Sequence, residues 1–155
     1  MRFHDIYQAE ETISQMRDFF SEEAFLQLPD FLLEDESQRL ESIFENISWY
    51  REEVAGKCRR YRPTEITSTL RSYLDFFQST TFLHFLEQVT DMDLEVDECE
   101  VLAYGPEDFE SIDLSLKEED CIEVIFDLTA SWEADNGGIL TYISDDTEIF
   151  YLTPG

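Results

Sequence analysis

The period of the hydrophobic pattern changes near residue 95, and this change constrains the fold more than any other feature. Before it, apolar residues recur every three or four positions, as on one face of an amphipathic helix. The first such face comprises Ile6, Ala9, Ile13, Met16 and Phe20. After it, apolar and polar residues alternate, as in a strand with one buried face. Helices followed by antiparallel strands are typical of an α+β domain.

The first half of the chain, residues 1–90, is predicted to be mainly helical. A short apolar stretch at 24–28 ends at Pro29 and has the length of a strand. Residues 48–63 show a less regular pattern. Further helices are expected over about 34–47, after a cap at Thr64, and from Ser79 or Thr80.

The second half, residues 95–155, is the predicted β core. Alternation at 98–103 and 121–128 predicts two strands, and 139–143 and 148–152 are expected to form two more. With no internal repeat and no Pro/Ser-rich linker, residues 1–155 are interpreted as one domain. About four or five strands are few for a closed barrel or jelly roll, so the fold is expected to be incomplete at the C-terminus.

Charge limits the choice of partners. The chain has 37 acidic and 10 basic residues, a net charge of −27. Such a field repels nucleic acids and anionic membranes and favours basic partners. It also leaves open an acidic mimic of nucleic acid. No apolar run is long enough for a transmembrane helix, and no secretory signal opens the chain. We therefore expect a cytoplasmic or nuclear protein that does not bind membranes.

The charges are unevenly distributed. Residues 91–123 hold fourteen carboxylates and one basic residue, whereas half of the basic residues lie within 51–62. This basic segment either folds against the chain's own acidic surface or docks an acidic protein or RNA. Aromatic residues interleave there, as RNA stacking requires, but the overall charge makes direct nucleic-acid binding the weaker hypothesis. The candidate docking residues are Arg51, Lys57, Arg59, Arg60 and Arg62.

Few residues suit catalysis. The two histidines, His4 and His84, lie in the helical half, and neither is near a candidate nucleophile elbow. There is no glycine-rich phosphate loop, and the three cysteines include no CxxC pair for zinc. From this inventory we predict no catalytic, cofactor-binding or metal-binding residues.

One constellation resembles a known family. Tyr104 closes a strand before an acidic loop, and an apolar strand then leads to Trp132 and the Gly137-Gly138 pair. This order resembles the core of the Fe(II)/2-oxoglutarate-dependent dioxygenases of the prolyl-hydroxylase type. It is most similar to the second, non-catalytic domain of two-domain ribosomal-protein prolyl hydroxylases. The resemblance implies helices packed on a double-stranded β-helix, a jelly-roll-like antiparallel sheet of cupin type.

The resemblance also shows what is missing. In the family, a His-x-Asp pair after the tyrosine binds iron. The corresponding positions here are Asp113 and Ser115, or Ser111 and Asp113 in the alternative register. Neither provides the pair. The second metal histidine and the 2-oxoglutarate anchor would come after Pro154. No Fe(II) or 2-oxoglutarate is therefore expected for this chain.

Our leading hypothesis is a non-catalytic dioxygenase-like module with a protein-binding or regulatory role. It would be part of, or derived from, a 2-oxoglutarate-dependent ribosomal-protein prolyl hydroxylase. Its partner would be a basic protein or a catalytic domain of the same family. The alternatives are a truncated active oxygenase, an acidic mimic that inhibits a DNA- or RNA-binding protein, and an unrelated α+β domain.

Overall fold

The computed structural model describes residues 2–111, 121–129, 140–143 and 149–152. The chain is an α+β protein that divides into two compact units. The helical unit comprises Met1–Ile47 and Glu65–Glu100, and the sheet unit comprises Ser48–Thr64 and Val101–Gly155.

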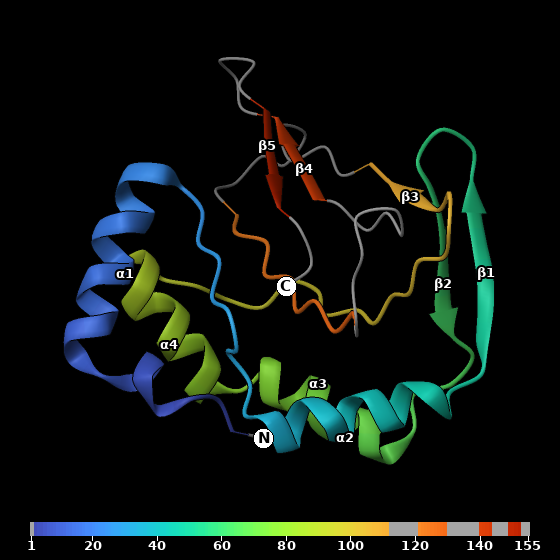
Figure 1. Cartoon of the computed structure of the whole chain (residues 1–155), viewed down its shortest axis with the longest axis horizontal. Helices are drawn as coiled ribbons and strands as arrows, with labels where there is room; N and C mark the ends of the chain where they lie inside the picture. The colour runs from blue at the N-terminus through green and yellow to red at the C-terminus, as the bar shows by residue number, and fades with distance from the viewer. Residues whose placement is uncertain (1, 112–120, 130–139, 144–148, 153–155) are drawn as a thin grey trace. The chain divides into compact units, whose positions relative to one another are not determined.

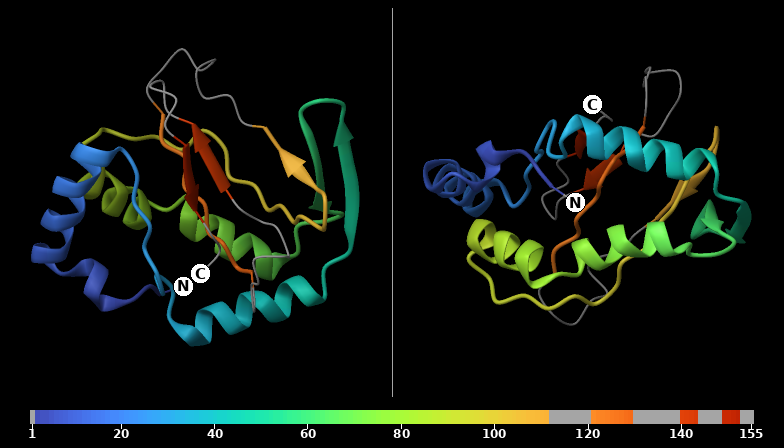
Figure 2. Two further views of the ribbon diagram at one scale, coloured as in Figure 1. Left: turned by 45° about the horizontal axis from the view of Figure 1, so that its top comes forward. Right: turned by 90° about the horizontal axis from the view of Figure 1, so that it is seen from below.

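The helical unit contains a 3-10 turn and the α-helices of the described chain (Figure 1). Helix α1 lies beside α4, and Figure 2 shows this pair from two further sides. Arg17 Nε donates to the carbonyl oxygen of Gln88 at 2.7 Å, which places a cation at the C-terminal turn of α4. The elements are η1 (Asp5–Gln8), α1 (Glu10–Glu23), α2 (Glu34–Glu45), α3 (Ser68–Phe77) and α4 (Thr80–Thr90).

Aromatic rings form the core of the helical unit. Phe3 stacks on Phe31 with 4.7 Å between ring centroids, and Phe85 lies 5.3 and 5.6 Å from these two rings. A β-bridge between Phe3 and Leu32 fixes the chain near its start against the segment before α2. Leu40 of α2 and Leu70 of α3 are almost completely buried. The helices therefore depend on tertiary packing of their apolar faces.

Side-chain caps fix two helix starts. The Ser79 hydroxyl accepts from Phe82 N at 3.3 Å, which confirms the predicted start of α4. The predicted cap at Thr64 is wrong, because Thr67 caps α3 by accepting from Leu70 N. Thr64 instead donates both its N–H and its hydroxyl to the carbonyl oxygen of Ser48. The predicted helix over 34–47 is confirmed as α2, two residues shorter.

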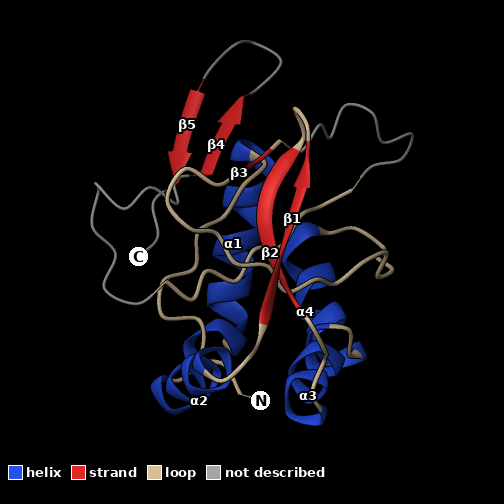
Figure 3. Ribbon diagram, turned by 90° about the vertical axis from the view of Figure 1, so that its right-hand side faces the viewer, coloured by secondary structure: helices blue, strands red, loops and turns tan. Residues whose placement is uncertain are grey.

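The sheet unit is built on a hairpin of β1 (Trp49–Val54) and β2 (Cys58–Pro63). The two-residue strand β3 (Phe109–Glu110) pairs antiparallel with β2, and Figure 3 shows β3 close to β2. At the hairpin turn, Lys57 N donates to Val54 O at 2.9 Å, and Gly56 has a φ of 74°. A positive φ at the third residue of a turn favours glycine.

A second hairpin pairs β4 (Leu140–Ile143) with β5 (Ile149–Leu152) in antiparallel register. These strands confirm the prediction for 139–143 and 148–152. The loop expected between them lies outside the described residues.

Three other strand predictions are wrong. Residues 24–28 form no strand, because Ala24 ends α1 in the left-handed region and the local β-bridge is made by Leu32. In 98–103, pairing is limited to one bridge between Ala103 and Tyr61. Residues 121–128 alternate as a strand would but have no partner strand in the described chain.

The two longer strands of the sheet therefore lie at 49–63 and not after residue 95. Within the described residues, the sheets formed are a three-stranded open sheet and a two-stranded hairpin, with no double-stranded β-helix.

We predict that Leu70→Ala lowers the free energy of unfolding of the helical unit by about 2–5 kcal/mol, because the site is 1% exposed and leaves a cavity. Ile6→Ala is the control, since Ile6 is 58% exposed and its loss should cost less than about 1 kcal/mol. Denaturant unfolding followed by the helical circular dichroism signal measures both. Equal losses would contradict the assigned core.

Candidate functional site

The basic segment 51–62 is the β1–β2 hairpin, and its register divides the arginines between two faces. Glu52 lies opposite Arg60, and Tyr50 lies opposite Arg62. Because side chains alternate along a strand, Arg60 and Arg62 share one face of β2, whereas Arg59 lies on the other face. The cations predicted as one docking cluster are thus separated into two groups.

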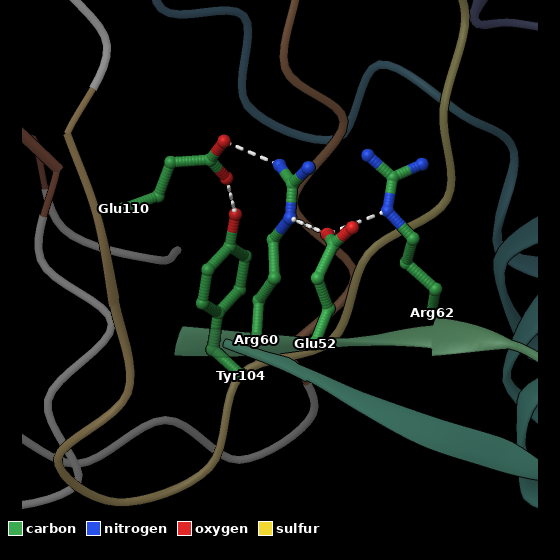
Figure 4. A network of polar contacts seen from close by, with 5 residues as sticks. All are labelled: Glu52, Arg60, Arg62, Tyr104 and Glu110. Carbon is green, nitrogen blue, oxygen red and sulfur yellow. Dashed lines mark hydrogen bonds and ion pairs between the residues drawn. The ribbon is translucent and has the colours of Figure 1, made fainter. Parts of the chain in front are cut away.

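On the first face, a polar network joins all three strands (Figure 4). Arg60 donates from Nε to Glu52 at 2.7 Å and from a terminal nitrogen to Glu110 of β3. Glu52 also accepts from Arg62 Nε at 2.7 Å. Glu110 accepts in turn from the hydroxyl of Tyr104. The Arg60 side chain is only 10% exposed, so these carboxylates neutralise a largely buried charge.

The pairing shifts two protonation equilibria. Hydrogen bonds from Arg62 and then Arg60 hold the pKa of Glu52 below its ordinary value of 4.5. Burial raises the pKa of Tyr104, and the hydrogen bond to Glu110 and its charge raise it further. The tyrosine ring is half exposed, but its hydroxyl is held at the Glu110 carboxylate. At neutral pH Glu52 is therefore ionised and the Tyr104 phenol is protonated.

On the second face, Asp108 is the carboxylate that pairs with the arginines. Its side chain is 4% exposed and lies 3.2 Å from Arg59 Nε and 3.6 Å from a terminal nitrogen of Arg51. The backbone N–H of Gly105 also donates to Asp108, at 2.8 Å. The Arg59 Nε–H has no aligned acceptor, so the 3.2 Å contact is an ion pair and not a hydrogen bond. The Arg59 guanidinium also lies 5.9 Å over the ring of Phe109.

Each of these carboxylates has an arginine partner, which limits their chemistry. A carboxylate paired with a guanidinium is held ionised and is a poor general acid. In the described part of the chain, no group of three or more His, Cys, Asp or Glu side chains is arranged to hold a metal ion. Ion pairs of this kind are suited to holding the strands in place and to displaying charged side chains.

The predicted site residues fall partly inside the described chain. Tyr104 belongs to the network, and Ser111 is exposed, with its N–H bonded to Lys57 O at 2.8 Å. The other members of the resemblance lie outside the described residues: Asp113, Ser115, Trp132, Gly137 and Gly138. Arg51, Arg59, Arg60 and Arg62 pair with the chain's own acids, whereas Lys57 is exposed at the turn. Their role in docking stays a prediction.

Three carboxylates were missed, namely Glu52, Asp108 and Glu110. A signal for Glu52 was present, because acids at 52 and 53 mirror arginines at 60 and 59 around the Ala55-Gly56 turn. Opposite charges at mirrored positions favour a hairpin of that register. Asp108 and Glu110 had no such signal, since their partners lie about fifty residues away along the chain.

We predict that Glu52→Gln reduces the dependence of stability on pH. With a lowered folded-state pKa, Glu52 stabilises the fold above about pH 4.5, and this contribution is lost as the pH falls through the folded-state value. At pH 7 the variant should be less stable than the wild type. On acidification it should lose less of its free energy of unfolding than the wild type does. Unfolding followed by tryptophan fluorescence at several pH values measures the effect. Glu53→Gln, on the opposite face, is the matched control. Its free energy of unfolding should depend on pH as that of the wild type does.

Comparisons with known proteins leave the family open. The chain matches no family model and no curated protein. Within the described residues, no helix is both long enough and apolar enough to span a bilayer. The functional proposal therefore depends on the arrangement of this chain's own residues.

Proposed function

We propose that this chain is a non-catalytic protein-binding module whose acidic surface docks a basic partner. The observation that carries the proposal is a difference between two charged segments. The arginines of the β1–β2 hairpin are neutralised by carboxylates of the same unit. By contrast, the acids at the start of the acidic segment, between Asp91 and Glu98, form no ion pair with a described basic residue.

This acidic strip comprises Asp91, Asp93, Glu95, Asp97 and Glu98, all of which are exposed. It follows α4 as a stretch without helix or strand, and no described basic residue forms an ion pair with these five side chains. Of the apolar residues between them, Met92 and Leu94 are less exposed, whereas Val96 is exposed. Two backbone contacts fix the start of the strip: Met92 N donates to Thr90 Oγ1, and Leu94 N donates to Glu87. The strip therefore presents solvated carboxylates on an anchored backbone.

Electrostatics favour a basic partner over an acidic one. A row of carboxylates in a chain of net charge −27 attracts cations over long range and accelerates encounter with a basic protein. The arginines of the hairpin would have to give up their present partners to bind a phosphate or an acidic protein. Breaking such a pair leaves a buried charge without a partner of opposite sign, and this destabilises the fold.

The dioxygenase relationship is proposed as the origin of this module. It rests on the residue order from Tyr104 to Trp132 and Gly137-Gly138, and a double-stranded β-helix is part of that proposal. Loss of catalysis is part of the proposal because neither register at 111–115 contains the family's His-x-Asp pair. The partner would then be a basic ribosomal protein or a catalytic domain of the same family, inside the cell.

We predict that neutralising the strip weakens binding of a short lysine-rich peptide by about tenfold or more, since each exposed ion pair contributes about 0.2–1 kcal/mol. The variant carries Asp91→Asn, Asp93→Asn, Glu95→Gln and Asp97→Asn. Asparagine also suits the left-handed backbone at position 91. Calorimetric titration at moderate salt measures the affinity.

The matched control changes four exposed acids of α1 by the same net charge, namely Glu10→Gln, Glu11→Gln, Asp18→Asn and Glu22→Gln. It should retain most of the affinity. Equal weakening in the two variants would show that only total charge matters and would contradict a docking site on the strip.

The spacing of the strip also favours a second candidate, an acidic mimic of nucleic acid. Carboxylates occur at alternate residues from 91 to 97, and a dense series of exposed negative charges can enter a phosphate-binding groove. In that case the chain would displace DNA or RNA from a basic binding protein. Competition measured by fluorescence anisotropy of a labelled oligonucleotide tests this, with the strip variant as the inactive control.

We predict that the chain alone neither binds Fe(II) stoichiometrically nor releases succinate from 2-oxoglutarate. The family's iron site needs two histidines and a carboxylate, and the histidines of this chain lie at positions 4 and 84, outside the 111–115 segment. Titration with Fe(II) and assay of succinate test this. Stoichiometric binding that is abolished by Asp113→Ala would instead support the truncated oxygenase.

A further inference from the structure

A cavity that is open to solvent lies between α2 and α3 of the helical unit. Its volume is about 240 Å³, enough for a small organic group. Its walls come from the first turns of α2 and from one face of α3. The lining residues are Glu36, Arg39, Thr69, Ser72 and Tyr73.

The carboxylate of Glu36 is buried in this cavity without a close donor. Its side chain is 6% exposed. In the described chain, its contacts are the Tyr73 hydroxyl at 3.5 Å, an Arg39 terminal nitrogen at 3.7 Å and Arg2 Nε at 3.9 Å. A charge-assisted hydrogen bond is normally about 2.7–2.9 Å long. A buried carboxylate with only long contacts retains a need for a donor.

The two arginines nearby satisfy this need poorly. Arg2 and Arg39 are 65% and 62% exposed, so water screens most of their charge. Arg2 also makes its short contact elsewhere, to Asp35 at 2.8 Å. A more compact donor that fits inside the cavity can approach Glu36 more closely than either guanidinium does.

The remaining polar atoms of the cavity also offer acceptors. The Ser72 hydroxyl donates its proton to the carbonyl oxygen of Ser68 at 3.1 Å, which leaves its lone pairs available. The Tyr73 hydroxyl donates to Glu36, and burial raises its pKa, so the phenol stays protonated. The Tyr73 oxygen already interacts with Arg39, which leaves one lone pair for a ligand. The cavity thus combines a negative charge with neutral acceptors.

We propose that this cavity is a binding site for a primary ammonium group. An ammonium has three N–H donors and no acceptor, which matches a carboxylate beside two hydroxyl oxygens. A divalent metal is the poorer match, because the cavity has one carboxylate and metals of that class prefer several oxygen ligands. An anion would face the buried carboxylate of Glu36. The ammonium belongs either to a small free amine or to a lysine side chain of a partner protein.

The experiment titrates the intact chain with methylammonium chloride and follows the amide chemical shifts of Ser72 and Tyr73 by NMR. Tetramethylammonium is the control ligand, since it carries the same charge without an N–H donor. We expect saturable shifts with methylammonium and none with tetramethylammonium. Equal responses, or no saturable response to methylammonium, would overturn the proposal.

Two variants of α2 should move the affinity in opposite directions. Glu36→Gln keeps the side-chain volume, removes the charge and should weaken binding by about tenfold or more. Arg39→Gln removes a competing cation and should tighten binding. Glu45→Gln, an exposed acid at the end of the same helix, is the matched control and should bind as the wild type does. Unchanged affinity in Glu36→Gln would overturn the proposal, provided that circular dichroism shows the variant to be folded.

A second ligand separates the two sources of the ammonium. N-acetyl-lysine methylamide carries the same group on a protein-like side chain. Tighter binding of this compound than of methylammonium indicates a lysine of a partner, and the reverse indicates a small free amine. Either result supports the site, whereas binding of both that persists in Glu36→Gln would overturn it.

Discussion

The pairing of the Arg60 guanidinium with two carboxylates holds the three-stranded sheet together. Arg60 lies on the central strand, Glu52 on one neighbour and Glu110 on the other, so a single side chain connects all three. Because β3 has only two residues, few backbone hydrogen bonds fix its place. The contacts of Arg60 therefore supplement the backbone pairing of β3 with a link to both strands of the hairpin.

The helices and the last hairpin could be predicted because their signals are local. A cap at Ser79 and an apolar period of three to four residues suffice for α4, and two short runs rich in aliphatic and aromatic residues, at 140–143 and 149–152, suffice for a hairpin. The β1–β2 hairpin was missed because its strands are rich in charged residues and show no regular apolar alternation. Conversely, residues 121–128 alternate well but have no partner strand in the described chain, and alternation alone does not supply one.

The candidate site could be predicted only in part. A cluster of cations at 51–62 is evident from the sequence, but whether it is available to a partner depends on distant carboxylates. Asp108 and Glu110 meet the arginines only through the pairing of β2 with β3, a non-local contact. The burial of Glu36 could not be predicted from the sequence either, because the acidic residues just before it, Glu34 and Asp35, are exposed. Burial of one carboxylate among several is decided by helix packing.

The hydrogen bonds from Thr64 to Ser48 close the base of the β1–β2 hairpin. Ser48 and Thr64 are also the two points where this hairpin interrupts the helical unit. The hairpin is therefore an insertion with its ends held together, and the cost of closing such a loop rises only slowly with its length. A change of length at the Ala55-Gly56 turn would therefore add little loop-closure entropy and would leave the pairing of β2 with β3 in place.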